Sequence, residues 1–326
     1  MMISPTLPAE LRAALDHKLQ GFSRTDAARR SERISNTYRS GGGSATIKSD
    51  SDALAYALAR MPATYAAVAA SLNALIEIAP DLAPQTLLDV GAGPGTASWA
   101  AAEAFPSLAS FTLLDANDSL RRLGLELVRD SARLEDFRYL PGEARANVAE
   151  AETADLVIAS YLIGELGESD QRALAEAMWA KARRALVAIE PGTPAGYARI
   201  LALRQQLIAS GAHVAAPCPH ARMCPLTAPD WCHFSQRLPR SQAHRQIKGA
   251  DVPFEDERFI YVALTREPVA TRHARVLAPP DAGKAGIAAK LCTETGLAVT
   301  TVPRRDKTAY ATARRWRWGD AVMAES

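Results

Sequence analysis

The sequence predicts an α/β protein: a doubly wound, mostly parallel sheet, N-terminal helices and a small C-terminal β-rich module. Short apolar runs alternate with helix-like segments over residues 84 to about 200, a pattern that gives a parallel sheet with right-handed crossovers. A glycine-rich turn joins the first run to the first helix of this region. From about residue 210 the chain is dense in Pro, Cys and His, and short apolar segments follow.

The composition sets outer limits on the class of protein. The 326 residues are 48% hydrophobic and 23% charged, enough for about two domains with a full core. A disordered chain, a collagen-like fibre and a disulfide mini-protein are excluded. No stretch approaches the ~20 apolar residues of a spanning helix. The N-terminus lacks a signal-peptide pattern, and its acidic residues disfavour a mitochondrial presequence, so we expect a reducing cytoplasm and no membrane partner.

Residues 1–49 are expected to form a basic N-terminal helical arm. Apolar residues recur at helical spacing up to about residue 22, arginines follow, and glycines at 41–43 break any helix. A solvated helix with a flexible turn and an arm that binds nucleic acid both remain open. Residues 50–80 are predicted as two helices, the second beginning near Pro62, that cap the next domain.

The domain predicted at residues 50–210 contains five strands and the helices between them. The predicted strands are 86–90, 111–115, 137–141, 154–160 and 185–191. The predicted helices between them are 97–105, 119–131 and 168–185. A ligand is expected outside the carboxyl ends of these strands, where the strand order reverses.

The glycine turn predicts the ligand. Asp89 lies at the end of the first strand, and Gly91, Gly93 and Gly95 follow with GxGxG spacing. A dinucleotide fingerprint needs a glycine where Thr96 stands, so the spacing favours S-adenosylmethionine (SAM) over NAD. Glycines allow close backbone approach, and amides at the helix N-terminus suit the amino-acid end of SAM.

A second acid supports this reading. Asp115 ends the next strand, where a carboxylate can accept both ribose hydroxyls, as in dinucleotide folds. Glu143 and Ala144 follow the third strand, where a loop would flank the adenine, and Ser160 ends the fourth strand. With the glycine turn, these residues complete the expected cofactor-binding set. The segment resembles a class I SAM-dependent methyltransferase.

The methyl-acceptor site is less defined. Methyl transfer mostly needs orientation, and a base only if the acceptor has a proton to lose. After the fourth strand the sequence reads ASYLIGEL, not the Asn-Pro-Pro-Tyr-type run of enzymes that methylate base amines. No cysteine lies there for a cytosine-C5 route. Ser160, Tyr161 and Glu165 are candidate catalytic residues, and none is diagnostic.

The four cysteines, Cys218, Cys224, Cys232 and Cys292, all lie in the module predicted at residues 211–326. They are 6, 8 and 60 positions apart and form no CxxC pair, which disfavours the usual zinc ribbon. Proline follows two of them, as it does beside some iron–sulfur ligands. From the spacing, zinc and an iron–sulfur cluster stay open, as do buried structural thiols.

Basic residues frame the same module. Cations can contact the phosphates of RNA, and Trp316 and Trp318, which lie among the arginines of the tail, can stack on unpaired bases. The alternative to RNA binding is a charged face that only contacts solvent. The candidate RNA-binding residues are Arg237, Arg240, Arg245, Lys248, Arg304, Arg305, Lys307, Arg314, Arg315 and Arg317.

A wider resemblance covers most of the chain from about residue 50. It is carried by ARMPATYAAV, LLDVGAGPGT, DLVIASYLIGEL, VAIEPGTPAGY, PCPHARMCPL, DWCHFSQRLPRS, EDERFIYVALTR and a tail with RRDK and WGD. The chain is similar to the bacterial branch of the methyltransferase-like small-ribosomal-subunit proteins, known in mitochondria as assembly factors.

The resemblance implies a [4Fe–4S] cluster on all four cysteines, with zinc as the alternative. It implies binding to the small ribosomal subunit and its rRNA, with no DNA partner. The expected function is rRNA methylation, subunit assembly or both, in a bacterial cytoplasm or, for a eukaryotic source, the mitochondrial matrix. A catalytically inactive assembly factor and a small-molecule methyltransferase with a zinc module are the alternatives.

Overall fold

The computed structural model describes residues 2–39, 42–142, 144–269 and 273–323. The strands are β1 Thr86–Val90, β2 Ser110–Asp115, β3 Asp136–Pro141, β4 Ala154–Ser160, β5 Ala182–Pro191, β6 His213–Ala216, β7 Phe234–Pro239, β8 Phe254–Thr265, β9 Ala274–Val276, β10 Asp281–Ala282, β11 Gly286–Thr293, β12 Gly296–Pro303 and β13 Ala321–Val322. The α-helices are α1 Ala9–Leu19, α2 Arg24–Arg39, α3 Asp50–Ile78, α4 Thr96–Ala104, α5 Asp118–Val128, α6 Ala144–Glu150, α7 Glu168–Lys181, α8 Pro194–Ala209, α9 Gln242–Lys248 and α10 Lys307–Ala313, with short 3₁₀ turns η1 Gly43–Thr46 and η2 Ile163–Glu165.

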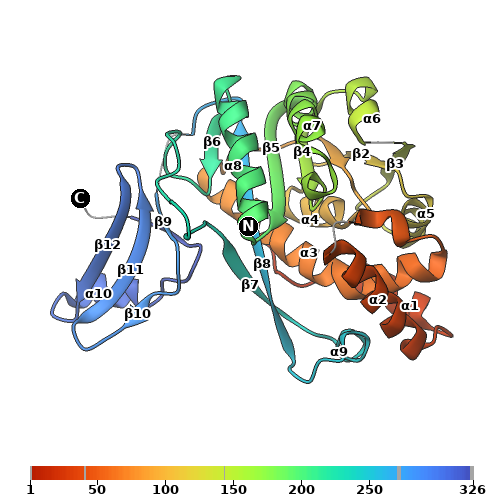
Figure 1. The fold of residues 1–326 in the computed structure, drawn as a ribbon, viewed down its shortest axis with the longest axis horizontal. Coiled ribbons are helices and arrows are strands. Elements are labelled where there is room, and N and C mark those ends of the chain that lie inside the picture. Colours follow the sequence, from red (N-terminus) through yellow and green to blue (C-terminus); the bar gives the residue numbers. More distant parts are fainter. Residues whose placement is uncertain (1, 40–41, 143, 270–272, 324–326) are drawn as a thin grey trace.

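Within the described residues, the main sheet has eight strands in the order β3-β2-β1-β4-β5-β8-β6, and β7 pairs with β8 (Figure 1). Strands β1 to β5 are parallel, and β8 lies antiparallel between β5 and β6. Helices α3, α4 and α5 pack on one face, and α6, α7 and α8 on the other. This is the class I methyltransferase strand order, so the predicted fold class is confirmed.

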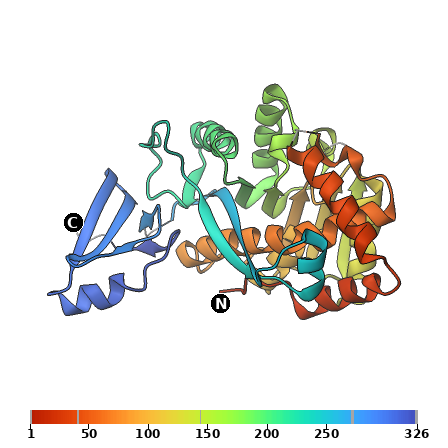
Figure 2. The same ribbon diagram turned by 60° about the horizontal axis from the view of Figure 1, so that its bottom comes forward.

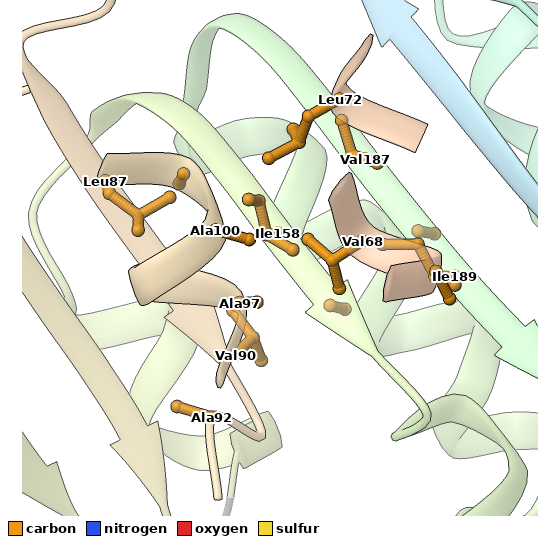
Figure 3. Packing of buried hydrophobic residues seen from close by; sticks show 14 of the residues in the cluster. Val68, Leu72, Leu87, Val90, Ala92, Ala97, Ala100, Ile158, Val187 and Ile189 are labelled. Carbon is orange, nitrogen blue, oxygen red and sulfur yellow. The ribbon is translucent and has the colours of Figure 1, made fainter. Parts of the chain in front are cut away.

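The core explains why the central strands read as continuous apolar runs. Strand β4 is buried along almost its whole length because helices cover both faces of the sheet. Figure 3 shows Val68 and Leu72 of α3, with Ala97 and Ala100 of α4, lying against the strands around Ile158. Alanine at these helix positions lets the helix and sheet backbones approach closely.

Residues 50–78 form one helix, not the two predicted, and Pro62 lies inside it. Proline removes one backbone hydrogen bond, but burial of both halves of α3 against the sheet holds the helix together. Among the described residues, α3 is also long and apolar enough to cross a membrane, which the sequence analysis did not expect. Its most apolar stretch is 72% buried inside the protein, as in the core helix of a globular domain.

The N-terminal arm is packed against the domain, not loosely attached. Leu11 and Leu15 of α1 are buried. The Asp52 carboxylate of α3 accepts hydrogen bonds from Arg30 and Arg33 of α2. Two arginines of the arm therefore bind a buried acid of the same chain.

The boundary expected between residues 210 and 211 does not separate the two sheets. Strands β6, β7 and β8 belong to the main sheet, and the second sheet contains β9 to β13. Residues 259–265 of β8 are buried beside β5, so this late apolar run completes the first sheet. Figure 2 shows the second sheet with α10 at the opposite end of the molecule from α1 and α2.

Candidate cofactor pocket and cysteine site

The glycine turn after β1 is held by its neighbours. The amides of Gly91 and Ala92 both donate to the Leu114 carbonyl of β2, at 2.8 and 3.0 Å. Gly91 has φ +69°, and a Cβ there would lie 2.7 Å from the Leu162 side chain. Gly95 has φ +83° and begins α4. Any other residue at either position would be strained, so the turn needs its glycines.

A cavity of 390 Å³ opens beside this turn, within the size range of small-molecule sites. Five of the residues predicted to bind the cofactor line it: Gly91, Gly93, Thr96, Asp115 and Ser160. Asp89 and Gly95 do not. Glu143 lies outside the described residues.

Asp89 supports the turn from behind. Its Oδ2 accepts hydrogen bonds from the Ser98 amide and hydroxyl, at 3.1 and 2.8 Å, and so fixes the first turn of α4 to the end of β1. Its side chain is fully buried, and burial raises its pKa to about 7. It acts as a positioning residue.

Asp115 holds the rim of the pocket. Its Oδ2 accepts from the Gly93 amide at 2.7 Å, and its Oδ1 accepts from the Asn117 amide at 2.8 Å. The Tyr139 hydroxyl donates to the Gly93 carbonyl at 2.7 Å. The turn and the acid predicted to meet the ribose thus form one rigid unit.

The N-terminal segment also contributes to this pocket, which the sequence did not predict. Residues 42–45, Tyr38, Tyr56 and Thr64 line it. We call residues 42–47 the strap. The side-chain Nδ2 of Asn117 donates to the Ser44 and Ile47 carbonyls, at 3.2 and 2.9 Å, and the Ser44 backbone amide donates to Glu165 at 3.2 Å. The glycines near position 42 signalled a turn, but nothing in the sequence indicated what it covers.

A second cavity of 1250 Å³ adjoins the first. The two share six lining residues, so they are continuous: Tyr38, Gly43, Tyr56, Thr64, Tyr161 and Glu165. The second cavity runs between α2, α3, the ends of β4 and β5, and α9. Arg60, Glu190 and Arg199 also line it. Glu190 belongs to the turn at the end of the fifth strand that was expected to shape the pocket, whereas neither arginine was predicted.

Two of the candidate catalytic residues lie where the cavities meet. Tyr161 has φ +59°, unusual for a non-glycine residue, and its hydroxyl donates to Glu257 at 2.8 Å. Burial raises the pKa of Glu165. Ser160 lines only the smaller cavity. Deeper in, Glu190 is fully buried and accepts from Arg199 at 2.8 Å.

The four cysteines converge from two regions. Cys218, Cys224 and Cys232 lie in the connection between β6 and β7, which runs between the two sheets (Figure 1), and Cys292 lies on β11. Burial, and then the charges of the other three cysteines, raise the pKa of Cys232. Burial also raises the pKa of Cys292, to about 12, with contributions from Cys218 and Cys224. All four thiols therefore lie within electrostatic range of one another.

Two further groups contact these thiols. The Tyr197 hydroxyl donates to Cys224 Sγ at 3.2 Å, and His220 Nε2 lies 3.7 Å from Cys292 Sγ. In the parts of the chain that the structure describes, no three His, Cys, Asp or Glu side chains are gathered closely enough to hold one metal ion.

The predicted RNA-binding cations fall into two sets. Around β7, α9 and β8 most are paired within the chain: Arg237 binds Asp256 at 2.8 Å, and Arg240 and Lys248 bind Glu255 at 3.3 and 2.6 Å. Arg245 is half-buried. The other set is exposed on the second sheet's module: Arg304, Arg305, Lys307, Arg314, Arg315 and Arg317.

The two tryptophans of the tail are half-buried. Trp316 packs on the core of the second sheet. Trp318 meets His233 edge-on, with the ring centroids 4.7 Å apart. Both rings therefore contribute to packing, and base stacking by either of them stays a prediction.

The strand order and the glycine turn define a protein with the class I SAM-dependent methyltransferase fold. Residues 50–323 match the family described as mitochondrial small ribosomal subunit Rsm22. Since this match covers far more than half of the chain, the protein belongs to the Rsm22 family. The resemblance to methyltransferase-like small-subunit proteins is thereby confirmed.

Two relatives illustrate the family. The human "Ribosome assembly protein METTL17, mitochondrial" is 28% identical over 295 residues, which cover 82% of this chain and 62% of that protein. The Schizosaccharomyces pombe "Rsm22-cox11 tandem protein 2, mitochondrial" is 24% identical over 336 residues, covering 85% and 44%. The chain thus spans less than two thirds of either relative.

The similarity to a solved structure is weaker. A precorrin-6y C5,15-methyltransferase from Geobacter metallireducens is 13% identical, with 61% of this chain and 86% of that chain covered and a TM-score of 0.41.

Proposed function

We propose that this protein binds SAM in the 390 Å³ cavity and serves in assembly of the small ribosomal subunit. The observation that carries the proposal is the glycine turn, fixed by Asp115 and Tyr139 beside a cavity of suitable size in a chain of the Rsm22 family. The turn offers backbone amides at the start of α4, which suit the carboxylate of SAM. Asp115 lies where the ribose is expected.

The larger cavity is the proposed place of a methyl acceptor. It opens into the SAM cavity at Tyr161 and Glu165. A buried carboxyl with a raised pKa suits a group that takes a proton from the acceptor. If no methyl group is transferred, the same cavities serve a non-catalytic assembly factor that SAM stabilises.

The four cysteines are the proposed ligands of a [4Fe–4S] cluster, with zinc as the alternative. Cysteine thiolates are the ligands that such clusters use, and all four converge here from two sheets. Bound there, a cluster would link the β6–β7 connection to β11, and its binding free energy would contribute to folding.

The exposed cations on the second sheet's module are the proposed contacts to rRNA. Positive side chains there can displace counterions from phosphates. Changing Arg314, Arg315 and Arg317 together to glutamate should weaken binding to small-subunit rRNA at low salt. The matched control is Arg237→Glu, on the set already paired within the chain. Equal affinity of the triple variant and the wild type would refute this surface.

The expected compartment is the bacterial cytoplasm or, for a eukaryotic source, the mitochondrial matrix. Both relatives are named as mitochondrial proteins, which supports the matrix alternative. The comparisons give no support to the cytoplasmic expectation.

One assay distinguishes a methyltransferase from a non-catalytic assembly factor. Immature small subunits are incubated with SAM labelled on its methyl group, and rRNA and protein are then counted. Label in the rRNA, lost with Glu165→Gln, supports an enzyme. Absence of label, together with SAM binding and with subunits that fail to mature without the protein, supports the non-catalytic factor. A chain that binds neither SAM nor subunits would refute the whole proposal.

A further inference from the structure

Two buried arginines flank the four cysteines. Arg204 on α8 is 2% exposed, and Arg275 on β9 is 3% exposed. Both lie where the second sheet meets the β6–β7 connection, beside the residues that carry Cys218 and Cys292. His220, which Arg204 contacts, has its Nε2 3.7 Å from Cys292 Sγ.

Hydrogen bonds fix both guanidinium groups to the cysteine-bearing connection. Arg204 Nη2 donates to the His220 carbonyl at 2.6 Å. Arg275 Nε donates to the Pro217 carbonyl at 3.1 Å, and its Nη1 donates to the Gly319 carbonyl at 2.8 Å. The two arginines thus hold the backbone on either side of Cys218. Arg275 is also the cross-strand partner of Cys292 in the β9–β11 pair.

Neither arginine has a carboxylate partner in an ion pair among the described residues. Asp320 is the acid that Arg275 influences, and it accepts from the Arg317 amide at 2.7 Å. Within the described part of the chain, Nε and Nη1 of Arg204 are buried without a hydrogen-bond acceptor. A buried charge without a counter-charge is strongly unfavourable. Negative charge on the nearby sulfur atoms would therefore stabilise the two buried guanidinium groups.

A metal centre on the four cysteines supplies that charge. Four thiolates around a doubly positive [4Fe–4S] core leave two negative charges, and four thiolates around zinc leave the same. Two guanidinium groups cancel them. Four neutral thiols would instead leave Arg204 without a compensating charge and Arg275 with Asp320 as its nearby acid.

We propose that Arg204 and Arg275 are positioning residues that compensate the charge of an anionic cysteine–metal centre and fix it between the two sheets. This inference rests on the proposed cluster. It adds that the arginines hold the centre in place, and that their charge raises its reduction potential, because reduction makes the centre more negative.

The test uses the full chain, reconstituted anaerobically with iron and sulfide. The variants are Arg204→Met and Arg275→Met, with Arg204→Lys to keep the charge. The control is Arg266→Met, since Arg266 also donates to backbone carbonyls, of Ala182 and Trp179, away from the cysteines. Iron and sulfide per chain and the midpoint potential are measured.

The methionine variants should be at least tenfold harder to reduce, a fall of about 59 mV for one electron, or should lose iron. Arg204→Lys and Arg266→Met should stay near the wild type. If the methionine variants match the wild type in iron content and potential, the inference is overturned while the cluster stands. If the wild type holds zinc instead, the cluster proposal fails, and zinc loss to a chelator should then be faster in the methionine variants; equal rates would overturn the inference. A wild type that retains no metal overturns both.

Discussion

Asp89 is a buried carboxylate that shapes the cofactor pocket without lining it. Its Oδ2 binds Ser98, and its Oδ1 is buried without a donor among the described residues. Ionisation at that position is therefore poorly compensated. Asp155 is the opposite case: although burial opposes its ionisation, hydrogen bonds from the Gln85 and Thr86 amides and the charge of Arg183 keep its pKa below the ordinary value.

These two acids predict opposite effects of pH. The folded pKa of Asp89 is about 7 and its ordinary value is 3.8, so between these values the folded state binds more protons. Its contribution to the free energy of unfolding falls as pH rises through that window, by up to about 1.4 kcal/mol per pH unit. Asp89→Asn keeps the acceptor for Ser98 and removes this loss. Its melting temperature should exceed that of the wild type at pH 8, and the difference should shrink toward pH 4.

Asp155→Asn is the matched control. Because its folded pKa is depressed, Asp155 stabilises the fold above its ordinary pKa, and this stabilisation is lost as pH falls through the folded value. The variant should therefore melt below the wild type at pH 7 and approach it in acid. If the melting temperatures of Asp89→Asn and the wild type differ by the same amount at every pH, ionisation of Asp89 does not destabilise the fold.

Some residues of the cofactor pocket could be predicted from the sequence and others could not. The glycines of the turn were predictable because their positive φ leaves few alternatives. Asp115 was predictable from its place at a strand end. Tyr38 and Tyr56 were not, because their stacked rings, 6.0 Å apart, reach the pocket only through the packing of α2 on α3. No local pattern encodes that packing.

Among the elements, the strap turns the N-terminal segment into part of the pocket. Asn117 performs two tasks: its Oδ1 accepts from the Leu120 amide and caps α5, at 3.1 Å, while its Nδ2 donates to the strap carbonyls. Aspartate at this position would retain the cap and lose the donors. One substitution can therefore release the strap and spare the helix.

Asn117→Asp should weaken SAM binding about tenfold, or about 1.4 kcal/mol, with little change in melting temperature. Protease should also cleave within residues 42–48 faster. Asn73→Asp is the control, because Asn73 donates to the Ile3 carbonyl at 2.9 Å, away from the pocket. Calorimetric titration with SAM gives the affinities. Wild-type affinity together with unchanged cleavage would mean that the strap does not retain SAM.

Helix α3 shows why a sequence rule can fail at one residue. Pro62 marked a predicted helix start, yet it lies well inside α3 because packing on the sheet outweighs one missing hydrogen bond. Alanine there restores an amide that can donate to the Leu58 carbonyl. Pro62→Ala should raise the free energy of unfolding by about 1 kcal/mol, measured by urea denaturation. A loss of stability would show that α3 needs a local bend at Pro62 to fit the sheet.

At the scale of the whole molecule, the two sheets differ in how well they can stand alone. The first has an extensive core built from both helix layers. Among the described residues, the buried core of the second consists of Ala274, Val276, Ala289, Leu291 and Val322. The two sheets do not divide at residue 210, because β8 comes late in the chain but pairs with β5 and so belongs to the first sheet. No local pattern in the sequence encodes that pairing.

Because this core is so small, the stability of the second sheet depends on its contacts with the rest of the chain. A metal centre that joins Cys292 to the β6–β7 connection would be the strongest of these contacts. Removing the metal with a chelator, or changing Cys292 to serine, should therefore raise amide exchange and protease cleavage across residues 274–323. Exchange in β1, β4 and β5 should stay unchanged, because that core is extensive and only Cys218 and Cys232 pack against it, as partly buried residues. Hydrogen exchange read by mass spectrometry compares the two regions in one sample. Unchanged protection of residues 274–323 after metal loss would mean that packing against Trp318 and its neighbours holds the second sheet by itself.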